Sequence, residues 1–410
     1  MKQDSALSRR QLLFGAGAGG LALGLGALRP VFAAGNTFRI GALNPVSGAG
    51  GPYGSGMQKM IIAAAKEVNA AGGAGGRKFE VFAEDTQTTP DAAVLAVKKL
   101  IEVNKVQAVM GTWSSGITLA VMPITTAAGI PLMCTSGAPA ISTNDKADLV
   151  WRFQATTERF GQAFAKIAAG HGFKHAATMA FNNASGLGNT EGFKRAWKAM
   201  GHEVVAQVVY EPKQPSYRSE LQQVLAAKPD VIVTGSYLPD TTIFLREWYQ
   251  TGQPTKWIIP GWAANGKLVE ALGKEVCEGI LSVESIANEG APSYDHYTKL
   301  YRKVTGNDPG GNIYASMTYD MVVSFALAME AAGPGADPLA INARMRDVSN
   351  PPGKEVFGFA EGKAALKQGA IDYQGASSRL DFDRYGDVTP NFGESVITGG
   401  KIVRRAIIKI

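Results

Sequence analysis

The chain has 410 residues, of which 45% are hydrophobic and 19% are charged, and its formal net charge is +6. The first 33 residues account for half of that charge, through Lys2, Arg9, Arg10 and Arg29 against Asp4. The rest of the chain is only weakly basic and has no block of basic residues interleaved with aromatic ones, so nucleic acid is not expected as a partner. The remaining length of about 375 residues suggests two domains of ordinary size.

The beginning of the sequence predicts an export signal. Ser8-Arg9-Arg10-Gln11-Leu12-Leu13-Phe14 has the pattern of a twin-arginine signal, and an apolar run rich in Gly, Ala and Leu follows up to Leu28. We place the cleavage site after Ala33, so residues 1–33 form the predicted signal peptide. The alternative is a retained membrane helix, but the apolar run of about 17 residues is at the short limit for spanning. We therefore expect a soluble protein in the periplasm.

From Phe38 onward the sequence alternates between strand and helix patterns. A first run extends to about Gln154, and a second run of the same kind follows it, so we expect two consecutive α/β units, each with a parallel sheet. The first run has expected strands at Phe38–Leu43, Phe79–Ala83, Val106–Gly111 and Gly129–Cys134, with helices at Gly54–Asn69, after Thr89, and from Ile117 to Ala128. The second has strands at Ala176–Phe181, Glu203–Tyr210, Val231–Thr234, Trp257–Pro260 and Gly279–Val283, with helices near 188–200, 217–227, 240–251 and 266–272.

The pattern changes after Val283. Helical spacing predicts three helices in a row, and a Gly/Pro/Lys-rich stretch that follows them is expected to be irregular. Short strands are expected near the C-terminus. The helices are Tyr294–Thr305, Tyr314–Ala332 and Leu339–Asp347, the irregular stretch is Asn350–Gly375, and the strands are Ser378–Phe382, Glu394–Ile397 and Lys401–Ile408.

Two stretches predict the functional site. Met110–Ile117 and Pro131–Pro139 each pass from a short apolar strand into small hydroxyl residues and Gly. A helix pattern begins at Ile117, so Ser114 and Ser115 are expected near a helix N-terminus at the carboxyl end of a strand. Ligands bind at that edge of open α/β sheets, and free N–H groups there suit a carboxylate or another anion. The alternative is that Ser115 only caps the helix.

An ordered set of motifs resembles a known family. The chain is similar to the periplasmic solute-binding proteins of the branched-chain amino acid type, which serve ABC importers, and the resemblance covers essentially the whole chain after the signal. The motifs are Ile40-Gly-Ala-Leu-Asn-Pro-Val-Ser-Gly48, Tyr53-Gly54, Glu67-Val-Asn69, Glu84-Asp85-Thr86-Gln87 with Pro90, Val109-Met110-Gly111, Gly129-Ile130-Pro131 and Met317-Thr-Tyr-Asp320.

The resemblance implies two Rossmann-like lobes, the type I periplasmic binding protein fold, joined by three hinge strands and closing on a solute. Residues 34–154 and 285–391 would form lobe 1, and residues 155–284 and 392–410 would form lobe 2. It also implies a monomer that passes a small molecule to an ABC permease in the inner membrane, with no cofactor, no metal and no enzymatic role.

The family's binding residues can be transferred one position at a time. Ser115 would hold the carboxylate of the ligand beside Ser114, and Trp262 stands where the family has a Glu that neutralises an α-ammonium group. Ala138 replaces a Thr that helps to hold the amine, and Leu187 replaces a Tyr. The full predicted ligand-binding set is Tyr53, Trp113, Ser114, Ser115, Ser136, Gly137, Ala138, Leu187, Tyr237 and Trp262. Tyr314 and Tyr319 are expected to pack within the core.

Because the acid and the hydroxyl that would bind an amine are missing, we expect a solute that keeps an acid or amide end but lacks a free α-amine. Its body should be apolar or aromatic, and aromatic and short-chain carboxylates are the leading candidates. Two features could still accommodate an amino acid. Trp262 could hold an ammonium group by a cation–π contact, or Asp240 could enter from a neighbouring loop.

Other chemistry is weakly indicated. The loop Gly48–Gly54 is a degenerate dinucleotide-binding pattern, and Glu84-Asp85 could imitate the acid that binds a ribose, so an exported cofactor-binding enzyme is one alternative. A sensory ligand-binding subunit on the same fold is another. No Ser hydrolase motif surrounds the serines. The four histidines, which are expected at the surface, lack metal-site spacing. Cys134 and Cys277 lie in separate apolar runs and are expected to be buried thiols rather than a disulfide.

Overall fold

A computed structural model of the chain describes residues 36–410. The predicted twin-arginine signal and its cleavage site after Ala33 lie outside these residues. Within residues 36–410, no helix is both long and apolar enough to cross a membrane.

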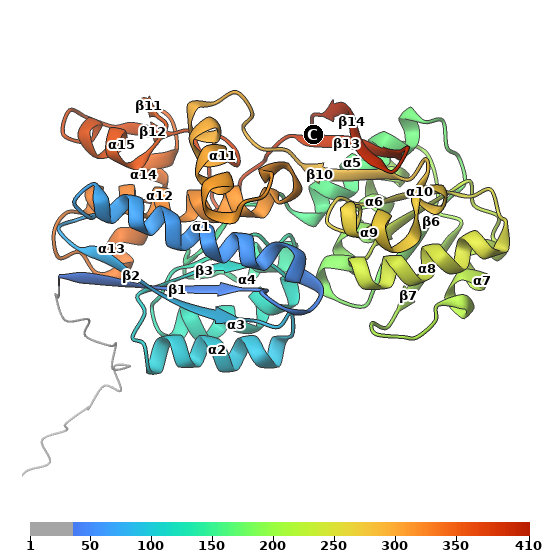
Figure 1. Ribbon diagram of the computed structural model, residues 1–410, viewed down its shortest axis with the longest axis horizontal. Helices are drawn as coiled ribbons and strands as arrows, with labels where there is room; N and C mark the ends of the chain where they lie inside the picture. Colours follow the sequence, from blue (N-terminus) through green and yellow to red (C-terminus); the bar gives the residue numbers. More distant parts are fainter. Residues whose placement is uncertain (1–35) are drawn as a thin grey trace, which may run out of the picture. The chain divides into compact units, whose positions relative to one another are not determined.

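The first α/β unit forms a parallel sheet with strand order β2-β1-β3-β4-β5 (Figure 1). Side chains alternate between its faces. Phe38 and Ile40 of β1 face the core that contains helix α1, whereas Leu43 faces a second core with helices α2 and α3. The strands are β1 (Thr37–Asn44), β2 (Lys78–Asp85), β3 (Ala108–Thr112), β4 (Leu132–Cys134) and β5 (Val150–Arg152); the helices are α1 (Gly51–Ala70), α2 (Pro90–Glu102), α3 (Ser115–Ala127) and α4 (Pro139–Asn144).

The second unit forms a larger sheet with strand order β14-β13-β10-β9-β8-β6-β7. Five neighbouring strands run parallel, in the order β7, β6, β8, β9 and β10. Strands β13 and β14 extend the sheet beyond β10 as antiparallel strands. The strands are β6 (Ala176–Phe181), β7 (Ala206–Tyr210), β8 (Val231–Gly235), β9 (Lys256–Pro260), β10 (Leu281–Ser285), β13 (Phe392–Thr398) and β14 (Lys401–Ile408); the helices are α5 (Thr157–Gly170), α6 (Ala184–Ala199), α7 (Arg218–Ala226), α8 (Leu238–Thr251), α9 (Gly266–Leu272) and α10 (Lys274–Cys277).

After β10 the chain returns to the first unit. Helix α12 (Ile313–Ala332) packs along α1, and α11 (Pro292–Thr305) also contacts α1. Asp320 of α12 is fully buried and accepts hydrogen bonds from the hydroxyl of Tyr373 (2.8 Å), the backbone N–H groups of Ala376 (2.9 Å) and Ser377 (2.7 Å), and the hydroxyl of Ser377 (2.6 Å). The acid of the Met317–Asp320 motif therefore fastens the end of the strand at Ile371–Tyr373 and the residues after it to α12.

The main differences from the sequence-based expectations lie in that last third. The stretch expected to be irregular contains a two-stranded parallel sheet of β11 (Lys354–Val356) and β12 (Ile371–Tyr373), with α15 (Phe359–Ala365) between its strands. The single helix expected over 339–347 is broken into α13 (Pro338–Asn342) and α14 (Met345–Ser349). The strand expected at Ser378–Phe382 is absent, because these residues pair with no strand in the described chain. The alternating apolar side chains there pack in the core, and the backbone does not pair with another strand.

Cys134 and Cys277 are buried and free, as expected, and burial raises the pKa of both thiols to about 11. Three of the histidines are exposed, but His202 is partly covered and stacks on Trp197 with ring centroids 4.2 Å apart. Among the residues that the structure describes, no group of three or more His, Cys, Asp or Glu side chains could hold a metal ion.

Candidate ligand-binding cleft

The candidate site is a cleft at the carboxyl ends of strands from both sheets. It is lined by Trp113, Thr135, Gly137, Gln154, Thr157, Phe160, Ser185, Tyr237, Trp262 and Tyr314. Within residues 36–410, no Lys, Arg, Asp or Glu side chain is part of this lining. The wall is therefore aromatic, with neutral polar groups, and this edge of the sheets is the usual place for a ligand in α/β folds.

Two groups of aromatic rings lie at the cleft. Trp113 lies at the centre of the first, with its ring centroid 5.1 Å from Tyr237, 5.9 Å from Tyr53 and 5.9 Å from Tyr314. On the far side, Trp262 meets Phe160 edge to face at 5.2 Å. Rings at such distances attract each other beyond the effect of burial alone. The first group thus connects residues from both sheets.

The two serines after β3 have different roles. Ser114 precedes α3, and its hydroxyl shares a hydrogen bond of 3.1 Å with the hydroxyl of Tyr237. Ser115 is the first helical residue, not the cap, and its hydroxyl accepts a hydrogen bond of 3.1 Å from the backbone N–H of Ala138. Ser115 therefore joins the loop after β3 to the loop after β4, and the interpretation of Ser115 as a simple helix cap is wrong.

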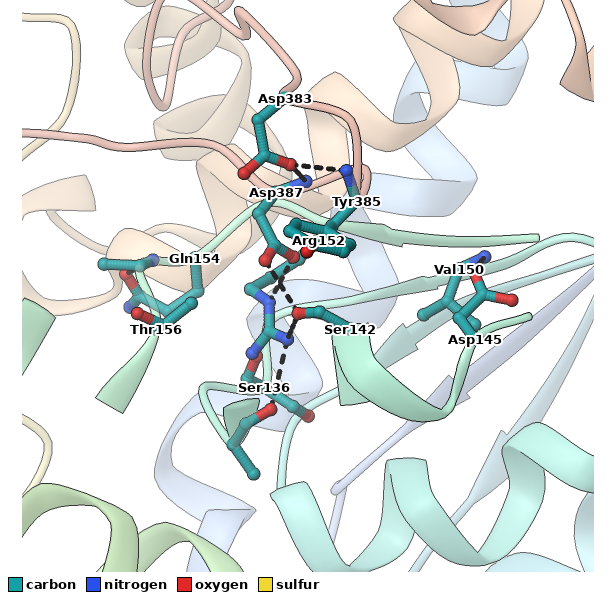
Figure 2. A network of polar contacts seen from close by, with 12 residues as sticks. Ser136, Ser142, Asp145, Val150, Arg152, Gln154, Thr156, Asp383, Tyr385 and Asp387 are labelled. Carbon is teal, nitrogen blue, oxygen red and sulfur yellow. Dashed lines mark hydrogen bonds and ion pairs between the residues drawn. The ribbon is translucent and has the colours of Figure 1, made fainter. Parts of the chain in front are cut away.

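The loop after β4 is held from behind by Arg152 (Figure 2). The guanidinium donates to the carbonyls of Ser136 (2.7 Å) and Ala138 (3.1 Å) and to the hydroxyl of Ser142 (2.7 Å). It also forms an ion pair of 2.7 Å with Asp387, although its own side chain is only 1% exposed. Gly137, between the two bonded carbonyls, lines the cleft. Arg152 is therefore a buried positioning residue for this wall.

Tyr53 closes a second contact across the cleft. Its hydroxyl donates to the backbone carbonyl of Trp262 at 2.7 Å and accepts a hydrogen bond of 2.9 Å from the side-chain amide of Asn265. The indole N–H of Trp262 donates to the carbonyl of Ser236 at 2.9 Å. Together with the bond between Ser114 and Tyr237, the Tyr53 contact links the wall built on the first sheet to the wall built on the second.

Besides α12, which begins at Ile313 beside the lining residue Tyr314, four helices of at least 13 residues in the described part of the chain begin at the cleft. Helix α3 follows Trp113 and Ser114, α5 begins at Thr157, α6 begins one residue before Ser185, and α8 begins after Tyr237. Each helix N-terminus carries a partial positive charge, although the N–H of Thr157 already donates to the carbonyl of Gly137 (2.7 Å) and that of Gly186 to the side chain of Asn183 (2.7 Å). The cleft is therefore suited to an anion even though no cationic side chain lines it.

Glu284 lies directly behind this lining. Its Oε2 accepts a hydrogen bond of 2.9 Å from the hydroxyl of Tyr314. Its Oε1 accepts from the side-chain amide of Gln154 (3.3 Å) and from the backbone N–H (2.9 Å) and hydroxyl (3.3 Å) of Ser285. Burial raises the pKa of this carboxyl to about 7, against the lowering effect of these hydrogen bonds.

The predicted site residues divide into three groups. Those that line the cleft are Trp113, Gly137, Tyr237 and Trp262. Those that lie behind the lining and hold it in place are Tyr53, Ser114, Ser115, Ser136 and Ala138. Leu187 alone is not brought to the cleft. Helix α6 begins at Ala184, so its first turn presents Ser185 to the cleft.

Sequence reasoning missed half a dozen lining residues. Tyr314 was expected to pack in the core, yet it packs against Tyr53 and Trp113 at the cleft surface. Thr157 and Ser185 are hydroxyl residues at helix starts in the second unit. This is a signal that the sequence does contain. Asp240 does not reach the cleft, since it is buried and accepts a hydrogen bond of 2.7 Å from the hydroxyl of Tyr217. The missed residues are Thr135, Gln154, Thr157, Phe160, Ser185 and Tyr314.

Comparisons with known proteins identify the family. A model of the periplasmic binding protein family matches residues 37–367. A Leu/Ile/Val-binding protein homolog from Brucella abortus (strain 2308) is 24% identical over 314 residues, which cover 72% of this chain and 77% of the relative. The structure is similar to a leucine-binding protein from Thermotoga maritima (TM-score 0.77, 21% identity, 91% of this chain and 99% of that one).

It is also similar to an ABC transporter solute-binding protein from R. palustris in complex with 4-hydroxybenzoate (TM-score 0.74, 20% identity, 91% of this chain and 97% of that one). These structures share the fold of two α/β units predicted from the sequence. The family model covers more than three quarters of the chain, and the chain belongs to the periplasmic binding protein family, whose members bind solutes.

Proposed function

We propose that this protein captures a small carboxylate that lacks an α-amine, with an aromatic or short apolar body, and delivers it to an ABC importer. The observation that carries the proposal is the convergence of the N-termini of α3, α5, α6 and α8 on a cleft without charged lining residues. Helix N-termini and hydroxyl groups bind carboxylates without a cationic side chain. Aromatic walls favour a flat apolar body over a polar one.

The same lining disfavours an α-amino acid. A buried ammonium group that lacks an anionic partner costs several kcal/mol. Trp262 occupies the position expected to carry the acid, and its indole N–H is already bonded to Ser236. Asp240 is turned away toward Tyr217. The routes that remain for an amine are a cation–π contact with an aromatic ring and the carboxyl of Glu284 behind Tyr314 and Gln154.

The proposal includes closure of the cleft by hinge motion between the two lobes, with the lobe boundaries that the family resemblance implies. The chain passes between the two sheets near Gln154, Ser285 and Phe392, and the backbone N–H of Ile286 donates to the carbonyl of Asn391 at 2.9 Å. A solute that contacts both walls stabilises the closed arrangement, because it binds that state more tightly than the open one. A permease then recognises the closed form.

The selectivity can be tested by calorimetric titration of matched solute pairs. We expect 3-phenylpropanoate to bind at least tenfold more tightly than phenylalanine, and 4-methylpentanoate more tightly than leucine, because each amino acid adds an unpaired ammonium group. Small-angle scattering of the protein saturated with the tighter solute should show a smaller radius of gyration. Tighter binding of the two amino acids would refute the proposal.

Export is proposed to use the twin-arginine pair. Arg9→Lys combined with Arg10→Lys should leave the precursor in the cytoplasm, since the pair is read by the export receptor. Immunoblots of periplasmic and cytoplasmic fractions measure the effect, with Lys2→Arg as a control that keeps the charge of the segment and leaves the pair intact. An undiminished yield of processed protein in the periplasm from the double variant would remove the assignment.

The role needs no covalent chemistry, and we propose that the protein has no turnover of its own. The loop that resembled a cofactor motif supports this. Both the backbone N–H and the hydroxyl of Ser47 donate to Asp85, and the hydroxyl of Thr88 donates to the carbonyl of Ser47. The acid that could imitate a ribose ligand is thus used to hold the loop, and the Trp113 ring lies close to Gly50 in the same loop.

A further inference from the structure

Glu284 occupies an unusual place for a carboxyl group, between the cleft and an outer groove. Through Tyr314 and Gln154 it bonds to two residues of the cleft lining, and it also lines an open outer groove to which Tyr314 contributes as well. Glu284 is partly exposed on the groove side, although burial still dominates the pKa of its carboxyl, and its bonds to Tyr314 and Gln154 lie on the side of the cleft. A proton can reach Glu284 without passing the solute.

The hydrogen bonds of Glu284 determine what Tyr314 offers to a solute. A phenol has one hydrogen, and burial raises the pKa of Tyr314 well above its usual value, so the phenol stays protonated. When Glu284 is ionised, that hydrogen is donated to Oε2. The Tyr314 oxygen then has only lone pairs left, with the Trp113 side chain also beside it, and it has no hydrogen to offer to a carboxylate in the cleft.

Protonation reverses this arrangement. Oε1 already accepts from three donors, whereas Oε2 accepts from Tyr314 alone, so Oε2 is the atom that can take a proton. A protonated Oε2 donates to the Tyr314 oxygen. The hydroxyl hydrogen of Tyr314 is then free to point at an anion in the cleft. The exchange moves one proton from solvent to Oε2 and breaks no covalent bond apart from the O–H bond of the proton donor.

We propose that Glu284 is a proton-linked specificity residue, which takes up one proton when a carboxylate binds so that Tyr314 turns from a hydrogen-bond acceptor into a donor toward the solute. This inference rests on the proposed function, because it assumes that the solute is an anion. It names a further determinant of that function, in a residue that does not itself line the cleft.

The charges around Glu284 are consistent with this role. The groups that contact or adjoin the carboxyl are neutral: Tyr53 of α1, Tyr314 of α12, Gln154, Ser285, Gly261 and Gly393. Farther along the groove, Arg404 is paired with Glu289 at 2.7 Å. The other charged groove residues are Lys267 and Glu270. Without a cation in contact, burial sets the pKa of Glu284 at about 7, which lies in the range where a modest pH change alters its charge.

The sign of the pH dependence follows from linkage. Below pH 7 the free protein already carries the proton, so a carboxylate binds without proton uptake. Above pH 7 binding must draw a proton from solvent, and the apparent affinity falls with the protonated fraction. For benzoate, which stays ionised throughout, the dissociation constant should rise about tenfold from pH 6 to pH 8.

The test is calorimetric titration of the full-length mature protein with benzoate at pH 6 and pH 8, in two buffers of different ionisation enthalpy. Wild-type protein should take up close to one proton per benzoate at pH 8 and almost none at pH 6. Glu284→Gln can donate its amide N–H to Tyr314 at any pH, so it should bind benzoate equally at both values, with no proton uptake. Glu289→Gln, in the same groove, should retain the wild-type pH dependence.

Tyr314→Phe provides a second variant that does not alter the carboxyl. It should weaken benzoate binding at pH 6 and abolish most of the difference between pH 6 and pH 8. Benzoate binding with no pH dependence and no proton uptake in wild-type protein would overturn the role of Glu284 while leaving the proposed function intact. Phenylalanine binding that strengthens as the pH rises would overturn both, because Glu284 would then act as the counterion of an amine.

Discussion

Replacing Arg152 by Met should lower the free energy of unfolding by about 3–5 kcal/mol, the usual effect of removing one partner of a buried ion pair. Methionine keeps much of the side-chain volume, so the decrease in the free energy of unfolding comes mainly from the lost charge and the lost hydrogen-bond donors. Asp387 would remain only 12% exposed on its side chain without its partner, and the carbonyls of Ser136 and Ala138 would lose their donors. Urea unfolding at neutral pH measures the change.

Arg344→Met is the matched control for that experiment. Arg344 also pairs with an aspartate, Asp347, at 2.9 Å, but both side chains are more than half exposed. An exposed pair of this kind contributes about 0–1 kcal/mol. Asp387→Asn in the Arg152→Met background should restore part of the lost stability, because the unpaired charge is removed. If Arg152→Met and Arg344→Met proved equally stable, Arg152 would not be the support that the hydrogen bonds indicate.

Trp113→Ala should weaken binding of the preferred carboxylate by about a hundredfold or more, which corresponds to about 2.7 kcal/mol. The indole is the ring that contacts Tyr53, Tyr237 and Tyr314 together, so its removal takes away a ligand wall and loosens the closed cleft. The same truncation leaves a cavity and should also lower stability. Calorimetry gives the affinity, and thermal unfolding gives the stability.

Trp248→Ala separates these two effects. Trp248 packs against Trp257 with ring centroids 5.7 Å apart and does not line the cleft. Its truncation should lower the unfolding temperature while leaving the affinity for the carboxylate close to that of the wild type. A folded Trp113→Ala variant with unchanged affinity would show that the solute binds elsewhere.

The periodic part of the fold could be predicted from the sequence because local patterns determine it. Strand β14 has the predicted bounds Lys401–Ile408, and strand β6 has the predicted bounds Ala176–Phe181. Both sheets and the return of α12 to the first unit were also expected. The strand predicted at Ser378–Phe382 was wrong, because alternation of apolar residues indicates only which side chains face the core. Whether a strand forms depends on a partner with free backbone groups, which the sequence does not reveal.

The candidate site was harder to predict because its contacts join residues that are far apart in the chain. Ser114 and Trp113 could be identified from a strand followed by small hydroxyl residues. Glu284 could not, since its position depends on Tyr314 and Gln154, which are 30 and 130 residues away. Leu187 was placed at the cleft by alignment, and in the first turn of α6 a shift of two residues exchanges it for Ser185.

The bond from Tyr53 to the main-chain oxygen of Trp262 has a consequence for how this protein could diverge. Because the acceptor is a carbonyl that every amino acid possesses, the contact does not depend on which side chain stands at position 262. A duplicated gene can therefore exchange that side chain, and with it the character of the cleft wall, while the attachment across the cleft is inherited unchanged. Selection for a new solute can then act on the codon for position 262 alone, while the hydrogen bond from Tyr53 is kept.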